Sequence, residues 1–136
     1  MFNGIIFKTG KIKIIERKKQ SFLIGIKSQL RFKNSDLGSS ISCNGVCLTL
    51  TKISGKIIFF YLSNETLKKS NFKNLKINQV INLEKSLTYG KKISGHFIQG
   101  HVDTTAKIKT INFIDKSWLL KLEISNKKLS RLLIEK

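Results

Sequence analysis

The pair Asn44-Gly45, in the middle of Ser39–Leu50, constrains the fold more than any other short stretch of this sequence. A two-residue hairpin turn of type I′ needs a positive φ at both central positions, which Asn and Gly tolerate best. The β-branched and apolar residues that follow indicate a strand with one apolar and one polar face. The apolar face holds Val46, Leu48 and Leu50. The polar face holds Cys47, Thr49 and Thr51, so the hairpin offers a thiol and hydroxyls outside the core.

The net charge of +18 and the pI near 10.2 raise nucleic acid as a partner. However, lysine, isoleucine and asparagine are abundant along the whole chain and proline is absent, as in a general compositional bias. The basic residues are scattered singly, without an Arg-rich helix, an aromatic RNA-binding pattern or a finger motif. We therefore predict no nucleic-acid partner.

The length of 136 residues and the hydrophobic fraction of 40% fit a globular chain that can bury a core. The start, MFNGIIF, has no signal-peptide pattern, and no apolar run is long enough to cross a bilayer. The chain has two cysteines, Cys43 and Cys47, and two cysteines separated by three residues do not make a secreted disulfide framework. These features predict a cytoplasmic protein with free thiols and no membrane partner.

Short apolar segments separated by turn residues indicate strands at 4–15, 21–26, 46–53, 57–62 and 80–83. Thr9-Gly10 interrupts the first of them and predicts a bulge or bend. Ser63 or Asn64 is expected to cap a short helix that contains Glu65 in its first turn. Several short strands with regular turns favour a sandwich or a closed barrel.

A shift of about 96 residues superposes two parts of the chain. It places Lys11-Ile12-Lys13 on Lys107-Ile108-Lys109 and Phe22–Ile24 on Trp118–Leu120. We therefore predict a complete small barrel over residues 1–88 and the first half of a second barrel over 89–136. Leucines at helical spacing behind Ser125 or Asn126 predict a helix over 126–136. The counterpart of Ser39–Leu50 would fall after Lys136, so we expect the sequence to be truncated within the second barrel.

Both histidines, His96 and His101, lie in one glycine-bounded segment. A histidine side chain can exchange protons near neutral pH, so this segment is a candidate for proton transfer. A zinc set of Cys43, Cys47, His96 and His101 is disfavoured because the long gap between the pairs matches no common finger. A nucleophilic pair of Cys47 and His101 is a second possibility. Alternatively, Cys47 is a buried small hydrophobe and one histidine satisfies its hydrogen bonds within a strand. The spacing alone leaves these interpretations open.

Five ordered motifs resemble alpha-type riboflavin synthase and its lumazine-protein relatives. They are Met1-Phe2-x-Gly4-Ile5-Ile6, Asn44-Gly45-Val46-Cys47-Leu48-Thr49-Leu50, Ser63-x-Glu65-Thr66-Leu67, Val80-x-Asn82-Leu83-Glu84 and Gly95-His96-x-x-x-Gly100-His101-Val102-Asp103. The resemblance implies an all-β chain of tandem six-stranded, Greek-key-like barrels with short helices, here with the second barrel incomplete. Asn3 departs from it, since the family usually has Thr at that position.

The resemblance also implies an activity. Riboflavin synthase is a transferase of riboflavin biosynthesis that moves a four-carbon unit between two molecules of 6,7-dimethyl-8-ribityllumazine. The products of this last step are riboflavin and 5-amino-6-(D-ribitylamino)uracil. The family works as a homotrimer without a metal or an organic cofactor. The alternative within the same family is a non-catalytic lumazine- or flavin-binding protein.

Position by position, the resemblance implies that Cys47 and Ser40 assist addition at C7 of the acceptor and that His101 transfers a proton from the C7 methyl group. The residues implied in substrate binding are Gly4, Ile5, Ile6, Cys47, Leu48, Thr49, Leu62, Ser63, Asn64, Glu65, Thr66, Gly100, His101, Val102 and Lys136. Backbone groups of Gly4–Ile6 would meet the edge of the heterocycle.

Overall fold

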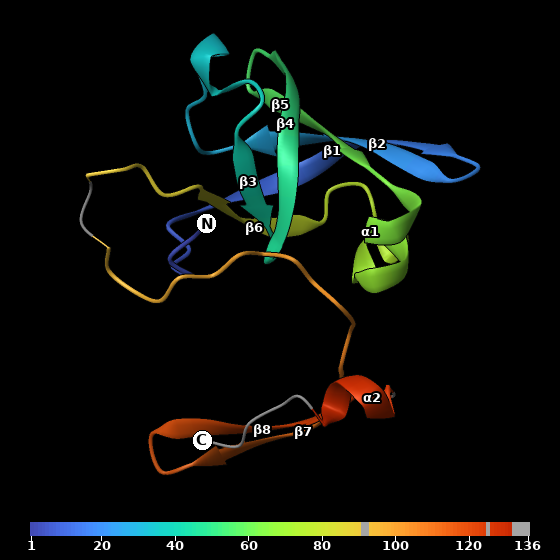
Figure 1. The fold of residues 1–136 in the computed structure, drawn as a ribbon, viewed down its shortest axis with the longest axis vertical. Coiled ribbons are helices and arrows are strands. Elements are labelled where there is room, and N and C mark those ends of the chain that lie inside the picture. The colour runs from blue at the N-terminus through green and yellow to red at the C-terminus, as the bar shows by residue number, and fades with distance from the viewer. Residues whose placement is uncertain (91–92, 125, 132–136) are drawn as a thin grey trace. The chain divides into compact units, whose positions relative to one another are not determined.

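Six antiparallel strands within residues 1–90 close into a barrel in the order β1-β2-β5-β4-β3-β6 (Figure 1). The computed structural model describes residues 1–90, 93–124 and 126–131. The barrel strands are β1 (Lys8–Lys18), β2 (Ser21–Ser28), β3 (Ser40–Cys43), β4 (Val46–Ser54), β5 (Ile57–Leu62) and β6 (Val80–Lys85). Antiparallel pairing of β1 with β6 closes the ring. The predicted all-β barrel of six strands is confirmed.

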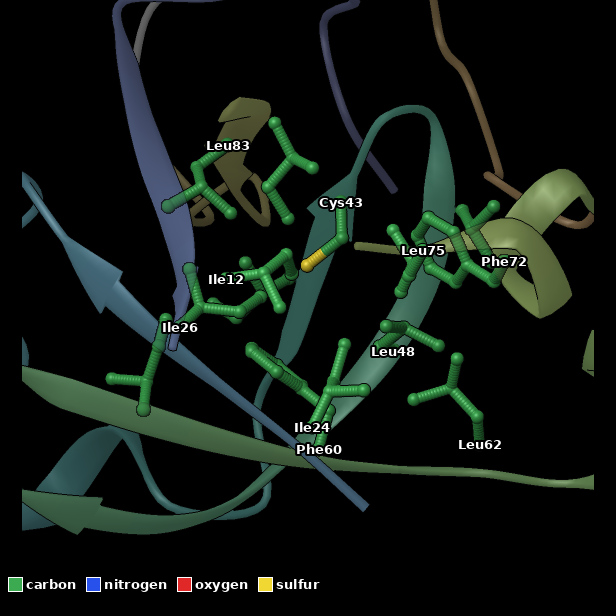
Figure 2. Packing of buried hydrophobic residues seen from close by; sticks show 14 of the residues in the cluster. Ile12, Ile24, Ile26, Cys43, Leu48, Phe60, Leu62, Phe72, Leu75 and Leu83 are labelled. Atoms are coloured by element: carbon green, nitrogen blue, oxygen red, sulfur yellow. The ribbon is translucent and has the colours of Figure 1, made fainter. Parts of the chain in front are cut away.

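Along the strands, about every second side chain points into the barrel and fills it, as period-2 alternation requires. Fully buried side chains include Ile12, Ile24, Ile26, Ile41, Leu50, Phe60, Leu62 and Leu83. Figure 2 shows several of these side chains converging from different strands. The predicted alternation in β4 is confirmed, because Val46, Leu48 and Leu50 are buried while Thr49 is exposed.

Short helical turns connect the strands. They are η1 (Asn34–Asp36), α1 (Asn64–Lys69) and η2 (Asn71–Asn74). Ser63 caps α1 as predicted, since its hydroxyl oxygen accepts a hydrogen bond from the N–H of Thr66. Phe72 of η2 and the adjacent Leu75 join the same core cluster as the strands (Figure 2). Among the described residues, no helix is both long and apolar enough to cross a membrane.

The predicted bulge at Thr9-Gly10 is wrong. The register of β1 against β2 shifts between Ile12 and Ile14 instead. Gly10 serves close packing, because a Cβ added there would lie 2.6 Å from the side chain of Ile26 and 2.8 Å from that of Leu83. The strand also begins at Lys8, after the positive φ of 78° at Gly4, and not at Gly4 itself.

Residues 103–136 form a second compact unit, and the first unit extends from Met1 to Val102. The second unit contains a hairpin of β7 (Lys107–Ile114) and β8 (Ser117–Glu123), followed by α2 (Lys127–Ser130). The side-chain oxygen of Asn126 caps α2 by accepting hydrogen bonds from two backbone N–H groups. The remainder of the helix predicted over 126–136, including Leu132 and Leu133, lies outside the described residues.

The two hairpins share an irregularity that supports the repeat. The pairing of β7 with β8 shifts between Ile108 and Thr110. These positions lie 96 residues after Ile12 and Ile14, where β1 and β2 shift. The partner residues on β2 and β8 are offset by the same interval, so the two hairpins have the same register.

Two neighbouring residues of β5 should differ greatly in how much they contribute to the stability of the barrel. Phe60 is fully buried between β2 and β4, whereas Tyr61 is 57% exposed on the outer face. We expect Phe60→Ala to lower the free energy of unfolding by about 3 to 5 kcal/mol through lost burial and a residual cavity. The matched variant Tyr61→Ala should lose less than about 1 kcal/mol. Urea unfolding followed by circular dichroism measures both, and equal losses would contradict this description of the core.

Candidate functional site

The β3–β4 hairpin presents a polar outer face. Asn44 and Gly45 both have positive φ, at 47° and 84°, as the predicted turn requires. In this register Ser40 lies opposite Thr49 and Ser42 lies opposite Cys47. Because Ile41 and Cys43 point into the core, the intervening serines point outward. The hairpin therefore carries three hydroxyls and a thiol on one face.

The two cysteines have opposite environments. Cys43 is fully buried and Figure 2 shows its sulfur within the core near Ile12. Burial raises the pKa of the Cys43 thiol well above its ordinary value, with a smaller contribution from Cys47. Cys47 is half-buried on the outer face, and both thiols are free. The cysteines therefore cannot converge on one metal ion, and no group of three or more potential metal ligands occurs among the described residues.

A segment from the glycine-bounded histidine motif lies directly on Cys47. The backbone N–H of Cys47 donates a 2.8 Å hydrogen bond to the carbonyl oxygen of Gly100. Gly100 has a φ of 76°, and a Cβ added there would lie 3.0 Å from Cβ of Cys47 and 3.1 Å from the ring of Phe2. Val102 packs against the core and His101 remains exposed. The fold thus brings the two chemistry-bearing segments of the sequence together.

The first four residues form an additional strand-like segment beside this contact. Phe2 is 1% exposed and exchanges backbone hydrogen bonds of 2.8 and 3.0 Å with Ile98. The N–H of Leu87 donates to the carbonyl oxygen of Met1, at 2.9 Å. Beyond this segment, Gly4 and Ile6 are exposed and Ile5 is half-buried. Residues 4–6 are therefore partly accessible, as a role in contacting a ligand requires.

Glu84 was missed by the sequence reasoning as a functional side chain. Its carboxylate accepts hydrogen bonds from the N–H groups of Asn3, at 2.7 Å, and Gly4, at 3.2 Å. The residue is nevertheless 7% exposed and lies opposite Ser42 in the β3–β6 register. The available signal in the sequence was weak, because Glu84 follows the alternation of β6 and resembles an ordinary outward-facing charged residue.

The remaining residues predicted to bind substrate differ in how accessible their side chains are to a ligand. Leu48 and Leu62 point into the core, so they would contact a ligand through backbone atoms. Ser63 and Glu65 are exposed, whereas Asn64 and Thr66 are half-buried. Lys136 lies outside the described residues.

Glu65 also has a charged neighbour on α1. The Lys69 ammonium, 2.9 Å away, holds the pKa of the Glu65 carboxyl below its ordinary value through a hydrogen bond and its charge. Glu65 would therefore present an anionic group on the surface of α1.

An open cleft of about 930 Å³ lies elsewhere on the barrel. Its lining comes from the start of β1, the end of β2 and the β4–β5 turn, and includes Lys11, Lys27, Arg31 and Lys56. It contains none of the predicted site residues. We place the candidate site at the β3–β4 face, because the thiol, the hydroxyls and the Gly100–Val102 segment meet there.

A family model for the lumazine binding domain matches residues 3–86. The chain is 35% identical over 136 residues to riboflavin synthase of Actinobacillus pleuropneumoniae, covering all of this chain and 63% of that protein. It is 39% identical over 109 residues to riboflavin synthase of Buchnera aphidicola subsp. Baizongia pistaciae, covering 79% of this chain and 51% of that protein. The chain therefore spans between about half and 63% of the length of these curated relatives.

Solved structures of LumP have the same fold. The complex of LumP with 6,7-dimethyl-8-(1'-D-ribityl) lumazine aligns with a TM-score of 0.76 and 23% identity, covering 93% of this chain and 71% of that chain. The LumP complex with riboflavin aligns with a TM-score of 0.77 and 24% identity, covering 96% of this chain and 71% of that one. At this identity the likeness establishes the fold.

The contact between Gly100 and Cys47 predicts the effect of a paired substitution. Gly100 and Gly90 have the same φ of 76°, but a Cβ at Gly90 would meet nothing within 4 Å. Gly100→Ala should therefore weaken docking of residues 96–102 by about 1 to 3 kcal/mol more than Gly90→Ala, because crowding adds to the shared backbone strain. Alkylation of Cys47, followed by peptide mass spectrometry, should accelerate in Gly100→Ala alone.

Cys43 provides an internal control for this measurement, because it should stay unreactive as long as the barrel is folded. Equal alkylation rates of Cys47 in the two glycine variants would contradict the docking of Gly100 on Cys47.

Proposed function

The chain belongs to the lumazine-binding domain family, and from this premise we propose that it is a riboflavin synthase. The proposed reaction is the dismutation of two molecules of 6,7-dimethyl-8-ribityllumazine to riboflavin and 5-amino-6-(D-ribitylamino)uracil. One molecule gives up a four-carbon unit and the other accepts it, so the enzyme is a transferase. The observation that carries the proposal is the contact of the Gly100–Val102 segment with Cys47 on the polar hairpin face.

The proposed catalytic groups come from these two segments. Cys47 and Ser40 lie on the same outer face, where they would assist addition at C7 of the acceptor by hydrogen bonding or, for the thiol, as a nucleophile. His101 adjoins Gly100 and is exposed, as a group that removes a proton from the C7 methyl of a bound ligand must be. An imidazole suits this step because one ring nitrogen can accept a proton while the other donates a hydrogen bond.

Substrate binding is proposed for the accessible backbone and hydroxyl groups around them. Backbone groups of Gly4–Ile6 would pair with the edge of the heterocycle, and Thr49 would face the ring beside Cys47. The end of β5 and the start of α1, from Leu62 to Thr66, would meet ring and ribityl oxygens. Ser63 and Thr66 suit hydroxyl recognition because their side-chain oxygens lie 3.1 Å apart and each can donate or accept.

We extend the proposal to the organisation of the full-length protein. Residues 1–88 would form the N-terminal lumazine-binding barrel and residues 89–136 the first half of a second one, which the shared register of the two hairpins supports. The family resemblance adds a cytoplasmic homotrimer that requires no metal or organic cofactor, with Lys136 contacting ligand in the second barrel.

A non-catalytic lumazine- or flavin-binding protein is the second candidate. The close agreement of the fold with LumP favours it as an alternative. Against it, Cys47, Ser40 and His101 are all present, and a protein that merely binds ligand has no need of a thiol and an imidazole at one site.

The two candidates make different predictions for one experiment. The full-length protein is mixed with 6,7-dimethyl-8-ribityllumazine, ligand fluorescence reports binding, and absorbance reports riboflavin. We expect binding followed by riboflavin formation. Binding without riboflavin would establish the non-catalytic alternative, and absence of binding by the folded protein would overturn both.

Substitutions separate binding from chemistry. Cys47→Ala and His101→Gln should each slow riboflavin formation by roughly 100-fold or more, as loss of a general acid–base or nucleophilic group does, with a small change in lumazine affinity. His96→Gln is the matched control, because His96 is exposed in the same segment and is attached through its backbone to Asn3. Unchanged turnover in both test variants would assign Cys47 and His101 structural roles.

A further inference from the structure

Glu84 is a buried carboxylate on the outer side of the barrel wall. Along β6, Ile81 and Leu83 point into the core and each is 1% exposed. Alternation therefore directs Glu84 away from the core, where a charged side chain is ordinarily solvated. Its 7% exposure shows that another part of the chain covers it. Burial of this charge is tolerable only where donors replace the lost water.

The cover is the segment of residues 1–4. One carboxylate oxygen of Glu84 accepts the N–H of Asn3 at 2.7 Å, and the other accepts the N–H of Gly4 at 3.2 Å. Hydrogen bonds to an ionised acceptor are stronger than neutral ones. The side-chain oxygen of Asn3 is buried without a partner among the described residues, so that side-chain oxygen does not hold the segment. Attachment on this side therefore rests on Glu84 for Asn3 and Gly4, and on the N–H of Leu87 for the carbonyl oxygen of Met1.

The same four residues are held from the opposite side by residues 96–98. Phe2 exchanges hydrogen bonds with Ile98, and the N–H of His96 donates to the carbonyl oxygen of Asn3 at 3.3 Å. The ring of Phe2 lies beside Gly100, which in turn contacts Cys47. Glu84 is also in register with Ser42, the residue opposite Cys47. The carboxylate of Glu84 thus connects residues 1–4 to the position on β6 that is aligned with Ser42 and Cys47 on the neighbouring strands.

We propose that Glu84 is a positioning residue of the lumazine site. By holding the N–H groups of Asn3 and Gly4, it fixes where residues 4–6 begin and keeps Phe2 against Gly100. This inference rests on the proposed function, because it assigns residues 4–6 to the ligand. Glu84 itself contacts backbone groups and has no part in the chemical steps.

The test compares Glu84→Gln with Glu16→Gln. The amide side chain keeps the size of glutamate but replaces one acceptor oxygen and the charge by an N–H donor. Glu16 is exposed on β1, and its side chain has no hydrogen bond or ion pair among the described residues, so its substitution makes the same change in net charge without touching the segment. Hydrogen exchange of the ligand-free chain and lumazine affinity by fluorescence are measured on both variants.

In Glu84→Gln we expect amide exchange at Asn3 and Gly4 to accelerate roughly tenfold or more and the Kd for lumazine to rise roughly tenfold, as loss of a charge-assisted hydrogen bond predicts. Glu16→Gln should leave both unchanged. Protected amides in β2 and β5 show, in the same experiment, that the barrel is folded. If Glu84→Gln fails to fold, Glu84→Asp replaces it, since the shorter side chain keeps the charge but cannot reach both N–H groups.

Two results would overturn the inference. Unchanged exchange at Asn3 and Gly4 would show that Glu84 does not hold the segment. Faster exchange with unchanged lumazine affinity would show that holding the segment does not position the ligand. If the wild-type chain binds no lumazine, the proposed function has failed, and exchange at Asn3 and Gly4 alone upholds or overturns the anchoring by Glu84.

Discussion

Pairing of β1 with β6 is the interaction on which the candidate site depends. Lys8 lies opposite Leu83 in this pairing, so the chain before Lys8 runs alongside the end of β6 and reaches Glu84. Closure therefore does more than remove two unpaired strand edges. It delivers the first residues of the chain to a buried carboxylate that needs donors, and their N–H groups supply them. The position of residues 1–6 is thus a consequence of barrel topology.

The two-residue turn at Asn44-Gly45 determines whether the Cys47 thiol faces the core or the outside of the barrel. Because side chains alternate, a slip of one residue in the β3–β4 register would move Cys47 into the core and expose Leu48. The positive φ values at Asn44 and Gly45 select the two-residue turn that prevents this slip. The same register aligns Ser42 with both Cys47 and Glu84. The turn therefore determines that Cys47 of β4, Ser42 of β3 and Glu84 of β6 lie side by side across three adjacent strands.

Local patterns predicted those features that local physics determines. The turn, the two faces of β4 and the cap of α1 follow from residues within a few positions of one another, and all three were predicted from the sequence. The bulge at Gly10 was wrong because glycine serves bulges and close packing alike, and the crowding neighbours come from other strands. Glu84 and Gly100 were beyond local reasoning for the same reason. In the sequence, the partners of Glu84 are 80 or 81 residues away, and Cys47, the partner of Gly100, is 53 residues away.

Comparison of the β1–β2 and β7–β8 hairpins distinguishes strand pairing, which the local sequence determines, from burial, which depends on the neighbouring strands. Ile12 and Ile108 occupy equivalent places, as do Ile24 and Leu120, and the hairpins have the same register. Yet Ile12 and Ile24 are fully buried, whereas Ile108 is 54% and Leu120 50% exposed. In the first hairpin, β5 and β6 pair with its edges and complete a closed core, while β7 and β8 pair with each other alone among the described residues. An isolated two-stranded hairpin is marginally stable in water. Alternation and turn chemistry therefore suffice to set pairing, and burial of the same residues is a property of the closed barrel.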